Sequence, residues 1–524
     1  MTSRRSLLGG AGATAVVACA PIPGPAAIPC DTVAAEVMER GHRVRSPLAD
    51  RPEPADSVDV AIVGGGVAGL SAAWALRGAG LTVEVVELAD DVGGTARSSH
   101  GAALGAHYLT LPSPECEHVR AMLHEFGVIE AFDGDGRPRY AASALCLAPE
   151  ERLFVGGTFV EGLWPEGVAT GEDVRQRDAF AALVATLTTR RGNDGRPAFA
   201  IPIALSSRDP ALRDLAKLTF ADWLDAQGFT SPAFRWTMTY ACRDDFGVPP
   251  ERVSAWAGLH YFASRRPDPA DAVDLGTHVL TWPTGNGWLV DRLRATLPAP
   301  PTLGTIVRAV EPDGRVWFER AGDPTIRGVR ARAVLLAVPT PVADRLLGVP
   351  SPLVPEAAPW LTVQLDVSEP PGGTGVRTAW DTVLYGAEGL GYIDNAHFGH
   401  TAWRTRGPST LTWFSPVADR AALVDLSDEA AADRALTELA AAHPSLRSIV
   451  TAARVCRFGH GTVIPAVGLH DLDASGEPAL AVIATPSGVV ERAHTDLSGM
   501  SLFEEASFHG VAAAASIRAR LTGS

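Results

Sequence analysis

The chain has 524 residues and a formal net charge of −15 at pH 7. That acidity argues against nucleic acid as a partner, because phosphate binding needs a basic face. The 46% of hydrophobic residues excludes a disordered polypeptide and can fill the cores of several domains. The six cysteines form neither a CxxC pair nor a cluster with histidine at zinc spacing, so we expect no metal site.

The first residues predict an export signal. Arg4 and Arg5 precede a weakly apolar run rich in Gly and Ala, which is too short to span a bilayer. The adjacent arginines resemble a twin-arginine signal. The run ends in a lipobox-like sequence, in which Cys19 would be acylated; a plain signal with an incidental cysteine is the alternative. We expect residues 1–19 to direct export to the periplasm or cell envelope, with a lipid anchor if Cys19 is acylated, and residues 20–55, rich in Pro and Ala, to form a loose tether.

A strand–turn–helix–strand unit is predicted next. Residues 58–63 (VDVAIV) are typical of a buried parallel strand, a helix is expected from Leu70, and residues 82–87 form the second strand. A Gly-x-Gly-x-x-Gly motif separates the first strand from the helix, and this pattern binds the pyrophosphate of a dinucleotide at a helix N-terminus. The residues we expect to contact the cofactor here are Gly64, Gly66, Val67, Ala68 and Gly69.

Each glycine of the motif has a mechanical role. Gly64 permits the tight turn, Gly66 lets the backbone approach the pyrophosphate, and Gly69 lets the helix pack close to the strand. Glu87 lies 18 residues after Gly69, where its carboxylate can accept both hydroxyls of an adenosine ribose. The unit therefore predicts an α/β, Rossmann-type dinucleotide-binding domain.

A second glycine pair follows the acid. The sequence Gly-Gly-Thr-Ala-Arg occupies residues 93–97, and at this point the chain resembles the flavin-containing amine oxidase and phytoene desaturase superfamily. The resemblance implies that Gly94, Thr95 and Arg97 wrap the pyrophosphate and ribityl chain of FAD. Family members usually carry arginine directly after the glycine pair, so Thr95 is a departure that leaves Arg97 as the basic group; a surface arginine is the alternative.

Later segments resemble further parts of the same family. Residues 104–108 resemble the segment beside the isoalloxazine ring, which implies that Ala106 contacts the flavin and makes His107 and Tyr108 candidate catalytic residues, or else core residues. In residues 305–308, which resemble a returning strand, Val307 would bond the adenine through its backbone. The closing flavin motif implies contacts from Asp496, Phe503, Glu505 and Ala506, with a turn or N-cap role as the alternative for Asp496.

The resemblance also implies a domain organisation. The FAD-binding domain would be built from three segments, and two insertions would form a mixed α+β substrate domain that encloses a pocket over the flavin. The three segments are residues 56–150, 276–350 and 461–524; the insertions are a largely helical cap over residues 151–275 and an antiparallel sheet over residues 351–460. Within the cap, we expect Arg243-Asp244-Asp245 to be a structural ion-pair cluster.

One family feature is absent. Amine oxidases of this family generally hold a lysine, through a water, near flavin N5, in the strand that here spans residues 359–367 and contains no lysine. Thr362 is the nearest counterpart, and the single lysine, Lys217, is expected at the surface of the cap. Flavin redox chemistry is unaffected, because desaturase-type members do without this lysine.

These observations predict an exported FAD-dependent oxidoreductase. It would transfer a hydride from a small-molecule, amine-like substrate to flavin N5 and pass the electrons to oxygen or another acceptor. The alternatives are a desaturase or isomerase of an apolar polyene or porphyrinogen-like substrate, a flavin-binding protein without turnover, and an NAD-dependent dehydrogenase.

Overall fold

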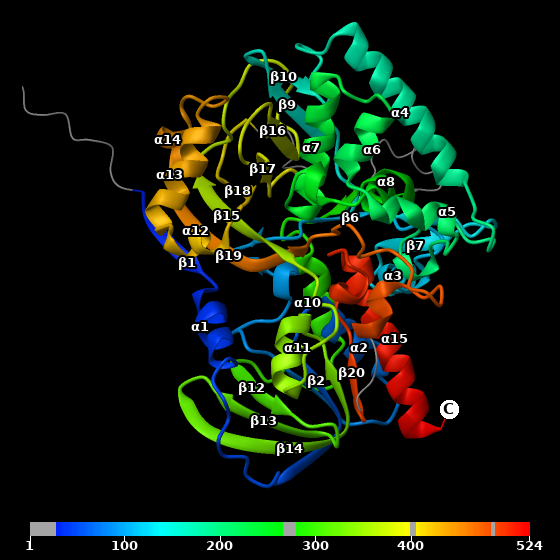
Figure 1. Cartoon of the computed structure of the whole chain (residues 1–524). Helices are drawn as coiled ribbons and strands as arrows, with labels where there is room; N and C mark the ends of the chain where they lie inside the picture. The colour runs from blue at the N-terminus through cyan, green and yellow to red at the C-terminus, as the bar shows by residue number, and fades with distance from the viewer. Residues whose placement is uncertain (1–27, 266–278, 399–404, 484–487, 524) are drawn as a thin grey trace, which may run out of the picture.

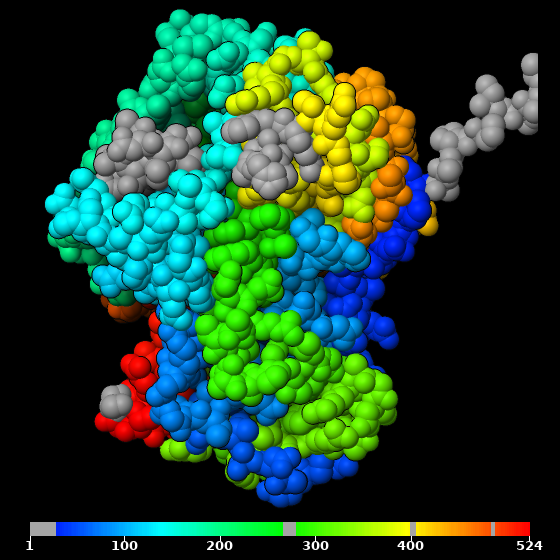
Figure 2. Space-filling view, turned by 180° about the vertical axis from the view of Figure 1, so that it is seen from behind, coloured from blue at the N-terminus to red at the C-terminus, as the bar shows by residue number. Residues whose placement is uncertain are grey.

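The computed structural model describes residues 28–265, 279–398, 405–483 and 488–523, so the export signal expected over residues 1–19 lies outside the described residues. Two lobes lie one above the other in Figure 1. The lower lobe contains β2, β12–β14 and β20, and the upper lobe contains an eight-stranded sheet and the helices beside it. Seen from behind in Figure 2, the green chain that follows β11 (Val279–Thr281) descends between the lobes.

The lower lobe is built on a six-stranded sheet. At its centre β2 (Asp56–Val63) runs parallel to β3 (Val83–Val86) and to β14 (Asp323–Leu336). Strand β20 (Val490–Arg492) pairs with β14 in parallel. Strand β13 (Arg315–Arg320) pairs with β14 in antiparallel order, and β12 (Thr305–Val310) pairs with β13 in the same way. Strands from three separated stretches of chain therefore meet in one sheet.

Both faces of β2 are buried, as its continuous apolar run predicts. Val60 and Ile62 face the helices α2 (Val67–Leu76) and α15 (Phe503–Thr522), whereas Ala61 and Val63 face the side of α11 (Thr340–Leu347). A Cβ on Gly510 would lie 2.2 Å from the carbonyl oxygen of Ala68, so α15 packs backbone to backbone on α2. The α/β, Rossmann-type fold class is confirmed.

The upper lobe contains an eight-stranded sheet in the order β1-β19-β15-β18-β17-β16-β9-β10. Its antiparallel centre is formed by β15 (Ala357–Val367), β18 (Ser409–Pro416) and β19 (Val450–Val463). The remaining strands are β16 (Asp381–Leu384) and β17 (Tyr392–Asp394), with β1, β9 and β10 described below. Helices α12 (Arg420–Asp425), α13 (Asp428–Leu439) and α14 (Leu446–Ile449) cover one side, as Figure 1 shows.

The region expected as a helical cap begins with two strands. The hairpin of β9 (Glu151–Val155) and β10 (Thr158–Glu161) turns through Gly156 and Gly157, both with positive φ, as a two-residue hairpin requires. The helices follow: α4 (Gly171–Thr189), α5 (Pro210–Arg213), α6 (Phe220–Ala226), α7 (Pro232–Phe246) and α8 (Ala255–Ser264). The region expected to be largely helical therefore begins with a hairpin, which was not expected and which extends the sheet, and the helices follow it.

The segment expected as a loose tether is ordered from Cys30 onward. Strand β1 (Cys30–Val33) pairs with β19, and α1 (Ala35–Arg43) then passes down the side of the molecule between the lobes (Figure 1). Arg40 forms an ion pair of 2.6 Å with Asp90 and Arg43 one of 2.8 Å with Glu319. The tether prediction fails here because the composition does not reveal a free sheet edge more than 400 residues away or these ion pairs.

Short elements complete the fold. They are β4 (Ser98–Ser99), β5 (Ala102–Ala103), β6 (Tyr108–Thr110), α3 (Glu117–Glu125), β7 (Ile129–Phe132), β8 (Pro138–Tyr140) and α10 (Gly287–Ala295). Among the described helices, none is both long and apolar enough to cross a membrane.

Candidate functional site

The first glycine motif forms an open cradle at the carboxyl end of β2. Gly64 has φ +106°, and a Cβ there would lie 2.4 Å from the carbonyl oxygen of Ala337. A Cβ on Gly69 would lie 2.0 Å from the carbonyl oxygen of Gly64, so the helix packs as closely as expected. At Gly66 a Cβ would meet no atom within 4 Å. The first turn of α2, which begins at Val67 and Ala68, therefore presents free amide groups beside open space.

The second glycine pair lies against the first. Gly93 donates to the carbonyl oxygen of Gly65 at 2.8 Å, and a Cβ on Gly94 would lie 3.5 Å from the Cα of Gly66. Gly94 and Thr95 are exposed, so both face the open side. The Nε of Arg97 is buried and finds no hydrogen-bond partner among the described residues. The Nη1 of Arg97 lies 3.7 Å from Glu36, so the guanidinium keeps its Nε–H as a spare donor that is suited to a phosphate.

The acid at the end of β3 is turned toward this cradle. Glu87 accepts hydrogen bonds from the amides of Gly65 at 2.7 Å and Ala89 at 2.8 Å, and the side chain is only partly buried. Each carboxylate oxygen keeps a lone pair for a further donor such as a ribose hydroxyl. The amide of Thr305 donates to the carbonyl oxygen of Glu87 at 2.8 Å, so the start of β12, which carries Val307, lies beside the acid.

The predicted cofactor-binding residues near the C-terminus differ from one another in their surroundings. Asp496 accepts from the amide of Thr340 at 2.6 Å and pairs with His494 at 2.9 Å; although burial opposes it, these contacts hold the pKa of Asp496 at about 2. Asp496 therefore accepts from the first backbone amide of α11, a helix distant from it in the sequence. Glu505 is fully buried and accepts a hydrogen bond from the amide of Ile203 at 2.7 Å, so its carboxylate already has a partner within the protein. Contacts of Asp496, Glu505, Ala506 and Val307 with a cofactor stay predictions.

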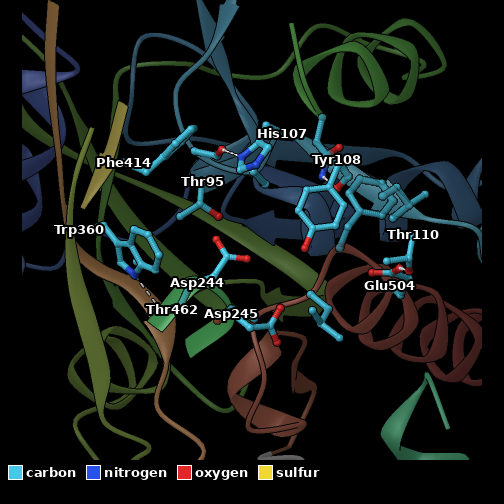
Figure 3. A pocket seen from close by; sticks show the side chains of 18 of the residues that line it. Thr95, His107, Tyr108, Thr110, Asp244, Asp245, Trp360, Phe414, Thr462 and Glu504 are labelled. Atoms are coloured by element: carbon cyan, nitrogen blue, oxygen red, sulfur yellow. Dashed lines mark hydrogen bonds between the residues drawn. The ribbon is translucent and has the colours of Figure 1, made fainter. Parts of the chain in front are cut away.

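A cavity lies where the lobes meet. It encloses about 990 Å³, counting open solvent at its mouth. Thr95, Ala106, His107 and Tyr108 line one part of it, and Thr362 and Phe414 line it from the sheet of the upper lobe. Figure 3 shows Thr95, His107, Tyr108 and Phe414 around this space. The amide of Ala106 donates to the carbonyl oxygen of Thr95 at 3.0 Å, which joins the cavity wall directly to the second glycine segment. The segment that forms the cradle therefore leads directly into the wall of the cavity.

The two candidate catalytic residues both lie on the cavity wall. The His107 ring stacks on Phe414 with 4.7 Å between centroids, and its Nδ1 bonds the carbonyl oxygen of Gly105 at 3.0 Å. Burial lowers the pKa of His107 to about 4, so the ring is neutral at neutral pH. Burial raises the pKa of Tyr108, whose hydroxyl lies 3.5 Å from a guanidinium nitrogen of Arg265.

Thr362 occupies the strand position where the family lysine was expected. It is 2% exposed and lines the cavity, and its Oγ1 has no hydrogen-bond partner among the described residues. Gln364, two residues further on the same face of β15, donates to the carbonyl oxygens of Ala102 at 3.2 Å and Ala103 at 3.1 Å. Lys217 is exposed and pairs with Asp214 at 2.7 Å, as expected of a surface residue.

Charged residues that the sequence reasoning missed also line the cavity. Asp244 and Asp245 project into it from the last turn of α7, and Glu504 from the first turn of α15 (Figure 3). The expected ion-pair cluster at residues 243–245 is not formed by Asp244 within the described part of the chain, where Asp245 pairs with Arg265 and no ion pair of Asp244 is found. The sequence carries no signal for this, since α7 belongs to an insertion without a recognisable motif.

The described residues contain no group of three or more His, Cys, Asp or Glu side chains that could hold a metal ion. The fold and the site together define a class: a Rossmann-type dinucleotide-binding lobe carrying an inserted sheet-and-helix lobe, with a cavity between them. Residues 62–126 match the model of the NAD(P)-binding Rossmann-like domain.

Particular proteins share the whole architecture. A redesigned putrescine oxidase has 22% identity and TM-score 0.62, over 88% of this chain and 99% of that one. Cyclohexylamine oxidase from Brevibacterium oxydans IH-35A has 18% identity and TM-score 0.59, over 89% and 100%. A fatty acid isomerase from P. acnes has 15% identity and TM-score 0.58, over 88% and 98%.

A curated sequence relative is achacin from Lissachatina fulica. The two are 30% identical over 189 residues, 34% of this chain and 33% of achacin, so the match spans about a third of that protein. The fold is therefore shared with these oxidases and the isomerase, which confirms the predicted resemblance at the level of architecture.

Proposed function

We propose that the protein is an FAD-dependent oxidoreductase of the amine oxidase type. The observation that carries the proposal is the continuous path from Glu87, past the open cradle at Gly66 and Gly94, to the cavity that begins at Thr95 and Ala106. A dinucleotide laid along this path would have its ribose at the acid, its pyrophosphate at the helix N-terminus and its far end in the cavity.

The residues present fit FAD. Space is open at Gly66 where a pyrophosphate would lie, and the buried Nε of Arg97 lacks a partner that a phosphate oxygen would provide. The flavin, when bound, supplies a hydride acceptor at N5 and hands electrons to oxygen or another acceptor. We further propose that residues 1–19 export the protein with this cofactor already held.

The chain's own residues shape the reaction space. Phe414 and Trp360 form apolar walls that exclude water and hold a substrate bond in place. His107 stays neutral, so it can accept or donate a hydrogen bond without bringing charge to the cavity. The hydroxyl of Thr362 is free to hold a water or a polar substrate group where other members of the superfamily place a lysine.

The charged wall favours a small polar substrate over an apolar one. Asp244, Asp245 and Glu504 line the cavity; Asp245 is paired with Arg265, but covering the Asp244 carboxylate with a polyene would remove its water without supplying a partner. An amine-like substrate supplies such a partner. This favours the amine over the desaturase or isomerase alternative.

Anaerobic mixing tests the function. The protein should be combined with panels of primary amines, amino acids and polyenes while the absorbance of the flavin is followed. Bleaching by at least one amine-like compound, reversed by admitting air, is the expected result. A flavin that every amine leaves oxidised, with bleaching by a polyene, would support the desaturase instead.

A further inference from the structure

Helix α1 lies beside the proposed path of the cofactor, at the end where the adenosine would bind. Figure 1 shows it at the side of the molecule, between β1 and the strands β12–β14. Its Glu36 lies 3.7 Å from Nη1 of Arg97, in the second glycine segment. Its Arg40 donates to the carbonyl oxygen of Leu88, the residue that follows Glu87, at 2.9 Å. The helix therefore contacts the segment proposed to hold the pyrophosphate and the segment proposed to hold the ribose.

The C-terminal end of α1 and the residues after it contact β13 and β12. Arg43 pairs with Glu319 of β13 at 2.8 Å, and the same carboxylate pairs with Arg308 of β12 at 3.0 Å. Arg308 also donates to the carbonyl oxygen of Ser46 at 3.0 Å. Because Arg308 follows Val307, these contacts lie beside the residue expected to bond the adenine. Together, the contacts of α1 extend from the pyrophosphate segment to the adenine segment.

Polar contacts, rather than a buried apolar face, hold α1 in place. None of its nine residues is buried, and its half-buried side carries the charged residues Glu36 and Arg40. Val44, its C-cap, adds a partly buried apolar contact with the lower lobe. The pair of Arg40 with Asp90, at 2.6 Å, has its carboxylate 66% exposed, and ion pairs this exposed are individually weak and screened by salt. A helix held in this way opens more readily than one that buries an apolar face.

The chain is attached to the protein on both sides of α1. Before the helix, β1 pairs in parallel with β19. After it, the carbonyl oxygen of Pro52 accepts a hydrogen bond from Nε1 of Trp317 at 2.9 Å. Ala34, between β1 and α1, has φ +63°, a left-handed conformation that is costly for a residue with a Cβ. This cost is released when the helix turns away from its docked position, so Ala34 is placed to act as a hinge.

We propose that α1 is a gate over the adenosine half of the FAD path, held shut by its ion pairs, which lifts about Ala34 when the cofactor enters or leaves. This inference rests on the proposed function, because it requires the dinucleotide to lie along the cradle. For a protein proposed to be exported with its cofactor already held, a gate that is shut most of the time would preserve the loaded state.

A gate differs from a fixed wall of the binding site in its effect on rates. A wall that contacts the cofactor stabilises the complex, so weakening the wall mainly speeds dissociation. A gate that must open for passage limits both directions, so weakening its docked state speeds uptake and release alike. The kinetics of FAD binding therefore separate the two roles.

Two variants that break the same ion pair from opposite sides test the gate. Arg40→Gln removes a positive charge and Asp90→Asn a negative one, so a direct electrostatic effect on the anionic cofactor would be opposite in the two. The gate predicts instead that both variants speed FAD uptake and release, each by about two- to fivefold. Flavin fluorescence reports release from the holoprotein, and uptake by protein from which the flavin has been removed. Arg139→Gln, which breaks an exposed ion pair with Glu130, is the control and should leave both rates unchanged.

A third variant should act in the opposite direction. Glycine adopts a φ of +63° without the cost of a Cβ, so Ala34→Gly stabilises the docked position of α1. Uptake and release of FAD should both slow in this variant. The amides of α1 should also exchange with deuterium more slowly in the holoprotein, because exchange follows the opening of the helix.

The outcomes separate the gate from its alternatives. Faster release with unchanged uptake would make α1 a wall and overturn the gate, as would rates that change in opposite directions in Arg40→Gln and Asp90→Asn. Should one of these two variants fail to fold, the other and Ala34→Gly still decide. A protein that binds no FAD contradicts the proposed function, whereas FAD exchanged at the wild-type rates in every variant contradicts the gate alone.

Discussion

The cradle and the cavity are built on different principles. The cradle is made of backbone: glycines at 64, 66, 69 and 94, together with one acid and one arginine, all within a stretch of 34 residues. The cavity is made of side chains that come from at least six separated elements and meet only in the folded protein. A site of backbone binds a constant group, the cofactor, whereas a site of side chains can vary with the substrate.

The two sites also differ in how their polar groups are satisfied. At the cradle, Glu87 already accepts hydrogen bonds from two backbone amides, so its carboxylate is partly satisfied within the protein. In the cavity, the buried Thr362 hydroxyl has no hydrogen-bond partner among the described residues, and Arg265, the arginine beside Asp244, is paired with Asp245. Unpaired polar groups are costly inside proteins and mark places where function has been favoured over stability.

The largest effect is expected at Gly66. Its φ of −72° suits any residue, and a Cβ there meets open space, so Gly66→Leu should fold normally while its side chain fills the pyrophosphate position. FAD should be absent from the purified variant. Gly134→Leu, at another glycine with free space around it, is the control and should retain the cofactor. A Gly66→Leu protein that keeps its flavin would show that the cradle holds something else.

A contrast of two buried threonines should separate function from stability. Thr362→Val removes a hydroxyl without a partner, so the free energy of unfolding should change by less than about 1 kcal/mol while turnover falls about tenfold or more. On the neighbouring strand, the Thr412 hydroxyl accepts from Asn395 at 2.8 Å and donates to Ala103 at 3.2 Å. Thr412→Val should cost about 1–3 kcal/mol in chemical denaturation. If the two variants lose equal stability, the account that the Thr362 hydroxyl has no hydrogen-bond partner is contradicted.

The cavity should make stability depend on pH near neutrality. Burial raises the pKa of Asp244 to about 7, so the folded protein binds a proton that the unfolded chain releases, and this stabilisation is lost as pH rises through 7. Asp244→Asn abolishes that loss. Its stability relative to wild type should therefore increase between pH 6 and pH 9, by about 1–2 kcal/mol. A constant difference across this range would show that Asp244 titrates normally.

The smallest effect is expected from α1, which borders the cradle, where its Glu36 lies 3.7 Å from Arg97. Arg40 bonds Asp90 and the carbonyl oxygen of Leu88, just beyond Glu87, so α1 fixes the loop beside the cradle. Replacing Arg40 and Arg43 by alanine should speed FAD dissociation a few-fold, since partly exposed ion pairs are individually weak. Stopped-flow measurement of flavin release would check this, with Arg139→Ala as the surface control. An unchanged rate of flavin release would show that α1 connects the two lobes without contributing to cofactor retention.

The same contrast explains what the sequence could predict. The sequence predicts the roles of four residues of the cradle, because these roles depend on neighbours close by in the sequence, where spacing alone determines the geometry. They are Gly64, Gly66, Gly69 and Glu87. Thr362 was found only through the family resemblance. The cavity position of Asp244 could not be predicted, because the residues that line the cavity with it come from segments far away in the sequence.

Two elements differ from the expectations for different reasons. The strand at residues 30–33 pairs with residues 453–456, and nothing in the neighbouring sequence indicates so distant a partner. The hairpin at residues 151–161 does carry a local signal, its Gly156-Gly157 turn, which the expectation of a largely helical cap leaves out. Long-range pairing therefore explains the first difference and not the second.

The most direct measurement is the cofactor content of the purified protein. Extraction after denaturation, with the released compound identified by chromatography and quantified against protein, should give close to one FAD per chain. A colourless protein that takes up no FAD on reconstitution, or one that binds a nicotinamide dinucleotide in its place, would contradict the account.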